Sequence, residues 1–190
     1  MSVASNKDSD LNRYREYLRV LAEMQLNPRL RVKEDVSDIV QQTLIQAHQD
    51  LGQFRGTSER ELKGWLKMIL NHTIINVAKK YGAKKRDFRI EQSIEQRMNE
   101  SAIRLAGELS GDRTSPSHQL MRQERAEQVA EALSCLLDDE RSALMLKHVH
   151  DWKVAEIAEH LGRTPEGVAG LLRRGLKKLR KSMQEAERCD

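Results

Sequence analysis

The sequence contains few aromatic residues, only 4% of the chain, and is also poor in the β-branched residues that stabilise sheets. Its two cysteines, Cys135 and Cys189, lie far apart and form no metal-binding or redox motif. Three prolines and ten glycines exclude a collagen-like chain and one dominated by low-complexity linker. No apolar run approaches the roughly 18 residues that a membrane span needs, and the N-terminal segment shows no secretory signal. These absences predict a soluble, cytoplasmic, helical protein without membrane insertion.

Length and polarity predict two small domains. The 190 residues suit one or two domains, and the hydrophobic fraction of 38% is enough for small cores but not for one large core. The expected fold class is therefore all-α, with two small helical domains joined by a partly helical linker.

Positive charge is concentrated in two segments. Lys and Arg total 33 against 29 Asp and Glu, so the net charge of +4 does not by itself indicate a nucleic-acid partner. Residues 63–89, however, contain eight basic residues and one acidic residue, and residues 168–181 contain six basic residues and no acidic one. Two contacts with a polyanion require two such segments. The alternative for each segment alone is a solvated helix face.

Apolar residues at helical spacing predict two helices near the N-terminus. The first covers residues 11–27, with Ser9 or Asp10 available as its cap. The second covers residues 35–51, and Gly52 follows directly as its stop signal.

A third helix is predicted from a capping box. Ser58 and Glu61 have the spacing of that motif, and Gly82 ends the apolar stripe. Trp65 lies on this stripe among apolar neighbours, so we expect it in the core.

The C-terminal part, residues 119–190, predicts a second helical domain after a linker at 87–118. Asp138 and Asp139 are expected to cap one of its helices. Cys135 lies on an apolar stripe and is expected to be a buried small hydrophobic residue.

Two short helices joined by a tight turn predict a helix-turn-helix. The segment Lys153–Leu161 is the first helix, Gly162 ends it, Thr164 caps the second helix, and Pro165 occupies its first turn. Lys153 has no capping hydroxyl, so the first helix frays or is capped by Asp151. The small Ala158 at the helix crossing, Gly162, the capping Thr164 and the basic end of the second helix together favour DNA binding over an ordinary helical hairpin in a core.

The ordered set of motifs resembles bacterial RNA polymerase sigma factors of the extracytoplasmic-function class. Residues 35–43 resemble the polymerase-binding helix of domain two, and residues 54–57 and 65–86 resemble its promoter-melting segment. Residues 137–141 and 155–180 resemble domain four. The resemblance implies sigma domain 2 at residues 1–86 and sigma domain 4 at residues 119–190.

The family's function then suggests a role for each surface. The chain is expected to bind core RNA polymerase and to direct promoter recognition, DNA melting and transcription initiation, while the polymerase supplies the catalysis. The resemblance places polymerase binding at Asp35, Asp38, Gln41 and Gln42. It places binding of the minus-ten element, as duplex and as melted non-template strand, at Phe54, Arg55, Gly56, Thr57, Ser58, Asn71, Asn76, Lys79, Lys80, Lys84 and Lys85. It places binding of the minus-thirty-five element at Arg163, Thr164, Glu166, Arg173, Arg174, Lys177 and Lys178.

The recognition helix departs from the family pattern. Ala169, Gly170 and Leu171 stand where the family often has Lys, Ser and Arg, which predicts thin base reading. Gly167 and Gly175 weaken the helix by roughly 0.5 to 1 kcal/mol each relative to alanine. The sequence leaves open whether these glycines allow close approach to DNA or pack against a neighbouring helix.

No catalytic, cofactor or metal site is expected. His148, His150 and His160 with Cys135 lack the spacing of a zinc site, and no phosphate-binding loop or nucleophile elbow is present.

Two other functions are open at this stage. One is a dimeric helix-turn-helix regulator that acts without polymerase, and the other is a helical adaptor that binds only proteins. The basic segment at 63–89 favours the sigma hypothesis over the regulator, which has no use for it. The resemblance also implies an anti-sigma factor as a partner.

Overall fold

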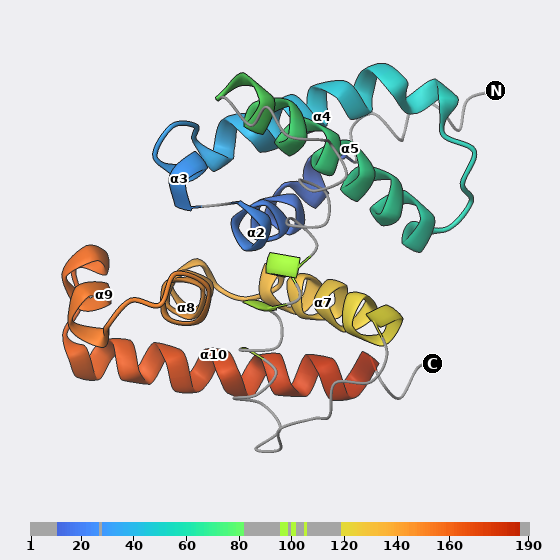
Figure 1. The fold of residues 1–190 in the computed structure, drawn as a ribbon. Coiled ribbons are helices and arrows are strands. Elements are labelled where there is room, and N and C mark those ends of the chain that lie inside the picture. Colours follow the sequence, from blue (N-terminus) through green and yellow to red (C-terminus); the bar gives the residue numbers. More distant parts are fainter. Residues whose placement is uncertain are drawn as a thin grey trace. The chain divides into compact units, whose positions relative to one another are not determined.

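The computed structural model describes residues 11–26, 28–81, 96–98, 100–101, 105 and 119–186. These residues form helices and no strand, in agreement with the predicted fold class. The chain divides into two compact units, Met1–Arg97 and Met98–Asp190 (Figure 1). Most of the predicted linker lies outside the described residues, so the domain boundaries stay a prediction. No helix in the described ranges has the length and apolar character of a bilayer-spanning segment.

The first unit is built on three helices that pack against one another, α2, α4 and α5 (Figure 1). Its elements are η1 (Leu11–Tyr14), α2 (Arg15–Gln25), α3 (Pro28–Arg31), α4 (Val36–Asp50), η2 (Leu51–Gln53) and α5 (Glu59–Lys80). Leu18, Leu21, Ile39, Leu66 and Leu70 are at most 1% exposed and form the centre of its core. The helical apolar spacing in the sequence therefore marks the residues that meet in this core.

Local signals explain most helix ends in this unit. The Asp35 carboxylate accepts a hydrogen bond from the Ser37 amide at 2.7 Å and caps α4. Gly52 is not the stop signal expected: α4 ends at Asp50, and the chain continues as the 3₁₀ turn η2, with Leu51 in the right-handed helical region. The proposed caps Ser9 and Asp10, and the stop at Gly82, lie outside the described residues.

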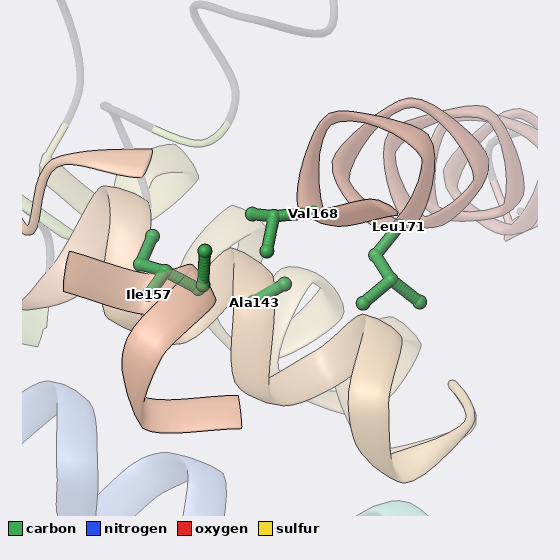
Figure 2. Close-up of a cluster of buried hydrophobic side chains, with 5 residues drawn as sticks. Ala143, Ile157, Val168 and Leu171 are labelled. Atoms are coloured by element: carbon green, nitrogen blue, oxygen red, sulfur yellow. The ribbon is translucent and has the colours of Figure 1, made fainter. Parts of the chain in front are cut away.

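In the second unit, α10 packs against α7, α8 and α9. The elements are α7 (Gln119–Ser134), α8 (Asp138–Leu144), the π-helical turn η3 (Met145–Val149), α9 (Val154–Leu161) and α10 (Pro165–Ala186). Figure 2 shows Ala143 of α8, Ile157 of α9, and Val168 and Leu171 of α10 gathered in one cluster. This cluster holds the two helices of the helix-turn-helix against α8.

The turn between α9 and α10 forms as predicted. Gly162 has φ 61°, a left-handed conformation that glycine adopts without strain. The Thr164 hydroxyl accepts a hydrogen bond from the Gly167 amide at 3.1 Å, and Pro165 is the first residue of α10.

Two expected helix caps in this unit are wrong. Asp138 and Asp139 lie within the first turn of α8, and neither caps the helix, since the N-cap residue is Leu137. Their negative charges interact favourably with the helix dipole. The N-cap residue of α9 is Lys153 and not Asp151, and the Glu156 carboxylate accepts a hydrogen bond from the Lys153 amide at 2.6 Å.

Cys135 is exposed and not buried as predicted. It follows Ser134, the last residue of α7, so the helical period that predicted its burial no longer applies there. The turn is held instead by Arg141, whose Nη1 donates to the carbonyl oxygens of Ser134 at 3.3 Å and Leu136 at 3.2 Å.

Candidate nucleic-acid and partner interfaces

One face of α4 is exposed, and α4 contains no lysine or arginine. It carries the four residues predicted to bind polymerase, Asp35, Asp38, Gln41 and Gln42, all exposed. Asp35 is also the helix cap, and Gln41 accepts a hydrogen bond from Arg15 Nη2 of α2 at 2.7 Å. Ile45, on the same face, is 47% exposed. An acidic and amide-rich face with one exposed apolar residue suits a protein partner better than phosphate.

The loop before α5, residues 54–58, is organised by one carboxylate. Glu61 Oε2 accepts hydrogen bonds from the Thr57 amide at 2.8 Å and the Ser58 amide at 2.9 Å. The Ser58 hydroxyl in turn accepts from the Glu61 amide at 3.2 Å, which completes the predicted capping box. These bonds, those from the Ser58 and Thr57 amides first, lower the pKa of Glu61 from its ordinary value.

The Phe54 ring of this loop packs on Trp65 of α5, with ring centroids 5.1 Å apart. Trp65 is half-buried and not a core residue as expected, and the Phe54 ring of the loop lies against it. A Cβ at Gly56 would lie 2.3 Å from Phe54 Cζ and 2.9 Å from Glu61 Cβ. Gly56 is therefore needed for the close approach of loop and ring, a contact that no spacing in the sequence reveals.

The remaining minus-ten candidates are spread along α5. Asn71 is half-buried with its Oδ1 buried and unpartnered among the described residues, and Asn76 and Lys79 are exposed. From Ser58 to Lys80 the helix advances about 33 Å at 1.5 Å per residue. One nucleotide cannot contact both ends, so a bound strand would have to run along α5. Lys84 and Lys85 lie outside the described residues.

A groove between α4 and α5 brings two predicted surfaces together. Its walls include Gln42 and Ile45 from α4 and His72 and Asn76 from α5. A polymerase candidate and a DNA candidate thus border the same groove, although they are far apart in the sequence.

The basic residues of α10 fall into two rows. Arg174 and Lys178 point to α8, where Glu140 is 3% exposed: Lys178 Nζ lies 2.8 Å from Glu140 Oε2, and Arg174 Nε lies 3.7 Å from Oε1. Arg173 and Lys177 are exposed on the side of α10 away from the core.

The turn of the helix-turn-helix also meets α8. Arg163 Nη2 lies 2.7 Å from Asp139 Oδ2. The Thr164 side chain serves as the cap of α10, and Glu166 is exposed in its first turn. Three of the seven minus-thirty-five candidates, Arg163, Arg174 and Lys178, therefore have acidic partners within the protein.

The structure answers the question about the glycines at one position. A Cβ at Gly175 would lie 2.9 Å from Leu144 Cδ1, so Gly175 is a packing site for α8. A Cβ at Gly170 would meet only the end of the Arg174 side chain, at 3.2 Å. Leu171 is 8% exposed and belongs to the core cluster, so its side chain is not available to DNA.

Sequence reasoning missed two acidic residues that organise these surfaces, Glu140 and Glu34. Glu140 pairs with Arg174 and Lys178, which follow it by 34 and 38 positions in the sequence. Glu34 pairs with Lys80 and Tyr81. No local spacing signals such pairs. In the described part of the chain, no group of three His, Cys, Asp or Glu side chains is placed to hold a metal ion.

Comparison with known proteins identifies the class. The family model for Sigma-70 region 2 matches residues 13–84, and that for Sigma-70 region 4 matches residues 126–179. The chain therefore belongs to the sigma-70 family. It is 29% identical to the RNA polymerase sigma factor YlaC of Bacillus subtilis (strain 168) over 181 residues, which make up 95% of each chain. The protein is a promoter-recognising sigma factor of the extracytoplasmic-function class, as its motifs indicated. The regulator and adaptor alternatives are set aside.

Proposed function

We propose that the surfaces described above divide the work of this sigma factor among its partners. The exposed face of α4 binds core RNA polymerase, the 54–58 loop and α5 bind the minus-ten element, and α9 with α10 binds the minus-thirty-five element. The observation that supports this division is the separation of charge. The α4 helix has no lysine or arginine, whereas the end of α5 and the outer row of α10 present exposed lysines and arginines.

For the minus-ten element, the loop is the proposed site for a base taken out of the duplex. Glu61 holds its backbone in place, and Arg55, Thr57 and Ser58 are exposed around the Phe54 ring. Unpairing a base costs roughly a few kcal/mol. In a preformed loop, stacking on the aromatic ring and hydrogen bonds from the polar groups to the base edge offset this cost. The strand would continue along Asn71 and Asn76 to the lysines at the end of α5.

For the minus-thirty-five element, the outer row of α10 is the proposed contact. Arg173 and Lys177 are available to phosphate or base edges. Arg174, Lys178 and Arg163 would instead hold the helix-turn-helix on α8, which narrows the set suggested by the sequence.

We also propose a cytoplasmic location, catalysis by the polymerase alone, and an anti-sigma factor as a further partner. The support for the inhibitor is membership of the class, in which such inhibitors are common. An inhibitor that covers the α4 face would compete with core polymerase for the chain, which a competition pull-down measures.

The experiment that tests the polymerase surface is a pull-down of bacterial core RNA polymerase with the full chain. The double variant Asp38→Arg plus Gln42→Arg is expected to lose the polymerase. The matched control is Gln184→Arg plus Glu185→Arg, which makes the same change of charge on exposed positions of α10. Loss in the control as well, or retention by both variants, would contradict the assignment of the α4 face.

The reciprocal experiment tests the DNA surface. Charge reversal at Lys79, Lys80, Lys84 and Lys85 together is expected to abolish open-complex formation and to leave polymerase retention unchanged. Loss of retention in this variant would show that the two faces are not divided as proposed.

A further inference from the structure

The end of α5 is joined to the connection between α3 and α4 by a largely buried acid. Tyr81 directly follows α5, and its hydroxyl donates to Glu34 Oε2 at 2.5 Å, across 47 positions of sequence. The same hydroxyl lies 3.2 Å from the Lys33 carbonyl oxygen, and the Glu34 side chain is only 12% exposed. The hydrogen bond from Tyr81 is the main reason why the pKa of Glu34 is lowered. Glu34 is therefore ionised and held in place.

Two ammonium groups lie over the Tyr81 ring. Lys33 Nζ lies 5.3 Å from the ring centroid, and Lys80 Nζ lies 5.1 Å from it. Lys80 Nζ also lies 3.5 Å from Glu34 Oε1. One oxygen of Glu34 thus serves Tyr81 and the other serves Lys80.

The positive charge of Lys33 is not neutralised by Glu34, whose two oxygens serve Tyr81 and Lys80. Lys33 is exposed, and among the described residues no carboxylate lies within ion-pair distance of its ammonium. A cation–π contact orients an ammonium group but does not neutralise it. The Tyr81 ring thereby holds, near Lys80, a cation that no carboxylate of the described residues compensates.

We propose that Lys33 binds a backbone phosphate of nucleic acid and extends the basic end of α5 onto the α3–α4 connection. The inference rests on the proposed function, in which DNA runs along α5 to Lys79. A strand that reaches Lys79 and Lys80 would come within reach of Lys33, whose ammonium lies over the same tyrosine ring as that of Lys80. Tyr81 and Glu34 are positioning residues: they set the distance between the cations and do not contact the phosphate.

The test is a salt titration of DNA binding by the full chain, with a short duplex and the corresponding single strand as separate probes. Log K decreases as log salt rises, and each phosphate contact adds to the steepness of this decrease. For one lost phosphate contact, the slope is expected to become shallower by about 0.9 on the duplex or about 0.7 on the single strand. Lys33→Gln should show this loss on the probe that Lys33 contacts. Lys33→Arg should retain the wild-type slope. The thermal midpoints of both variants should equal that of the wild type, because Lys33 is exposed.

The matched control is Arg19→Gln, which removes one positive charge from the same unit. Arg19 lies 3.1 Å from Glu23 and 3.7 Å from Glu16, so its charge is already compensated and the slope should not change. An unchanged slope for Lys33→Gln, while Lys79→Gln lowers it, would overturn the inference and leave the proposed function standing. No effect of Lys79→Gln, or no DNA binding by the wild type, would overturn both the inference and the proposed path of DNA along α5.

Discussion

The two rows of basic residues on α10 are expected to respond to mutation in opposite ways. Arg174→Gln with Lys178→Gln removes two charges from the row facing α8, and Arg173→Gln with Lys177→Gln removes two from the outer row. The two double variants have the same net charge and the same helix. They differ in the partner lost, since the first pair faces Glu140 and the second faces solvent.

The structure sets the size of each effect. Loss of both cations leaves the Glu140 carboxylate, 3% exposed, without a partner. Breaking a fully buried pair costs about 3 to 5 kcal/mol. Lys178 and Arg174 are 50% and 57% exposed, so solvent screens the interaction. We therefore expect a loss of about 2 kcal/mol, which lowers the melting temperature of a unit of this size by roughly 8 to 16 °C. The outer-row variant should change stability by less than about 0.5 kcal/mol.

Thermal unfolding and DNA binding together check this prediction. The chain has two tryptophans, so a Trp65→Phe background leaves Trp152 as the reporter of the second unit. In the outer-row variant, the slope of log K against log salt for duplex binding should become shallower by about 1.8, because two phosphate contacts of about 0.9 each are lost. The inner-row variant should leave the slope unchanged. A stable inner-row variant with a reduced slope would refute the assignment of Glu140 as the partner of that row.

Three further predictions follow from close contacts. Gly175→Ala should destabilise the second unit by roughly 1 to 2 kcal/mol in thermal unfolding, because its Cβ would lie 2.9 Å from Leu144 Cδ1. The matched variant Gly170→Ala should be neutral or stabilising, and equal midpoints would contradict the packing argument. Gly56→Ala should displace the Phe54 ring and change the fluorescence of Trp65 in a Trp152→Phe background; an unchanged spectrum would show that the loop can adapt. Because the pKa of Glu61 is lowered on folding, its stabilisation of the loop should be complete above its ordinary pKa of 4.5 and be lost as the pH falls below it. In Glu61→Gln, the Trp65 signal should lose this acid dependence.

Much of the fold follows from local chemistry and was therefore predictable. The Ser58 and Glu61 capping box, the Asp35 cap and the Gly162 turn each depend on residues at most four positions apart, whose geometry is set by the backbone. The helical apolar stripes likewise follow from the period of 3.6 residues. The order of these signals was also sufficient for the correct family.

The predictions that failed concern positions where a helix ends or a distant segment decides. Cys135 is exposed because α7 stops one residue before it. Trp65 is half-buried, with the Phe54 ring of the loop before α5 packed on it. Apolar spacing identifies which side of a helix turns inward, but it contains no information on what covers that side.

The sequence by itself determined the all-α class, the helix-turn-helix and the two basic segments, since composition, caps and periodicity act over a few residues. Only the tertiary structure decided which basic residues have acidic partners. Glu140 engages Arg174 and Lys178. Glu34 engages Lys80 and Tyr81, and no carboxylate of the described residues pairs with Lys33. Charge compensation depends on distances between segments that lie tens of residues apart, and these distances exist only once the helices have packed.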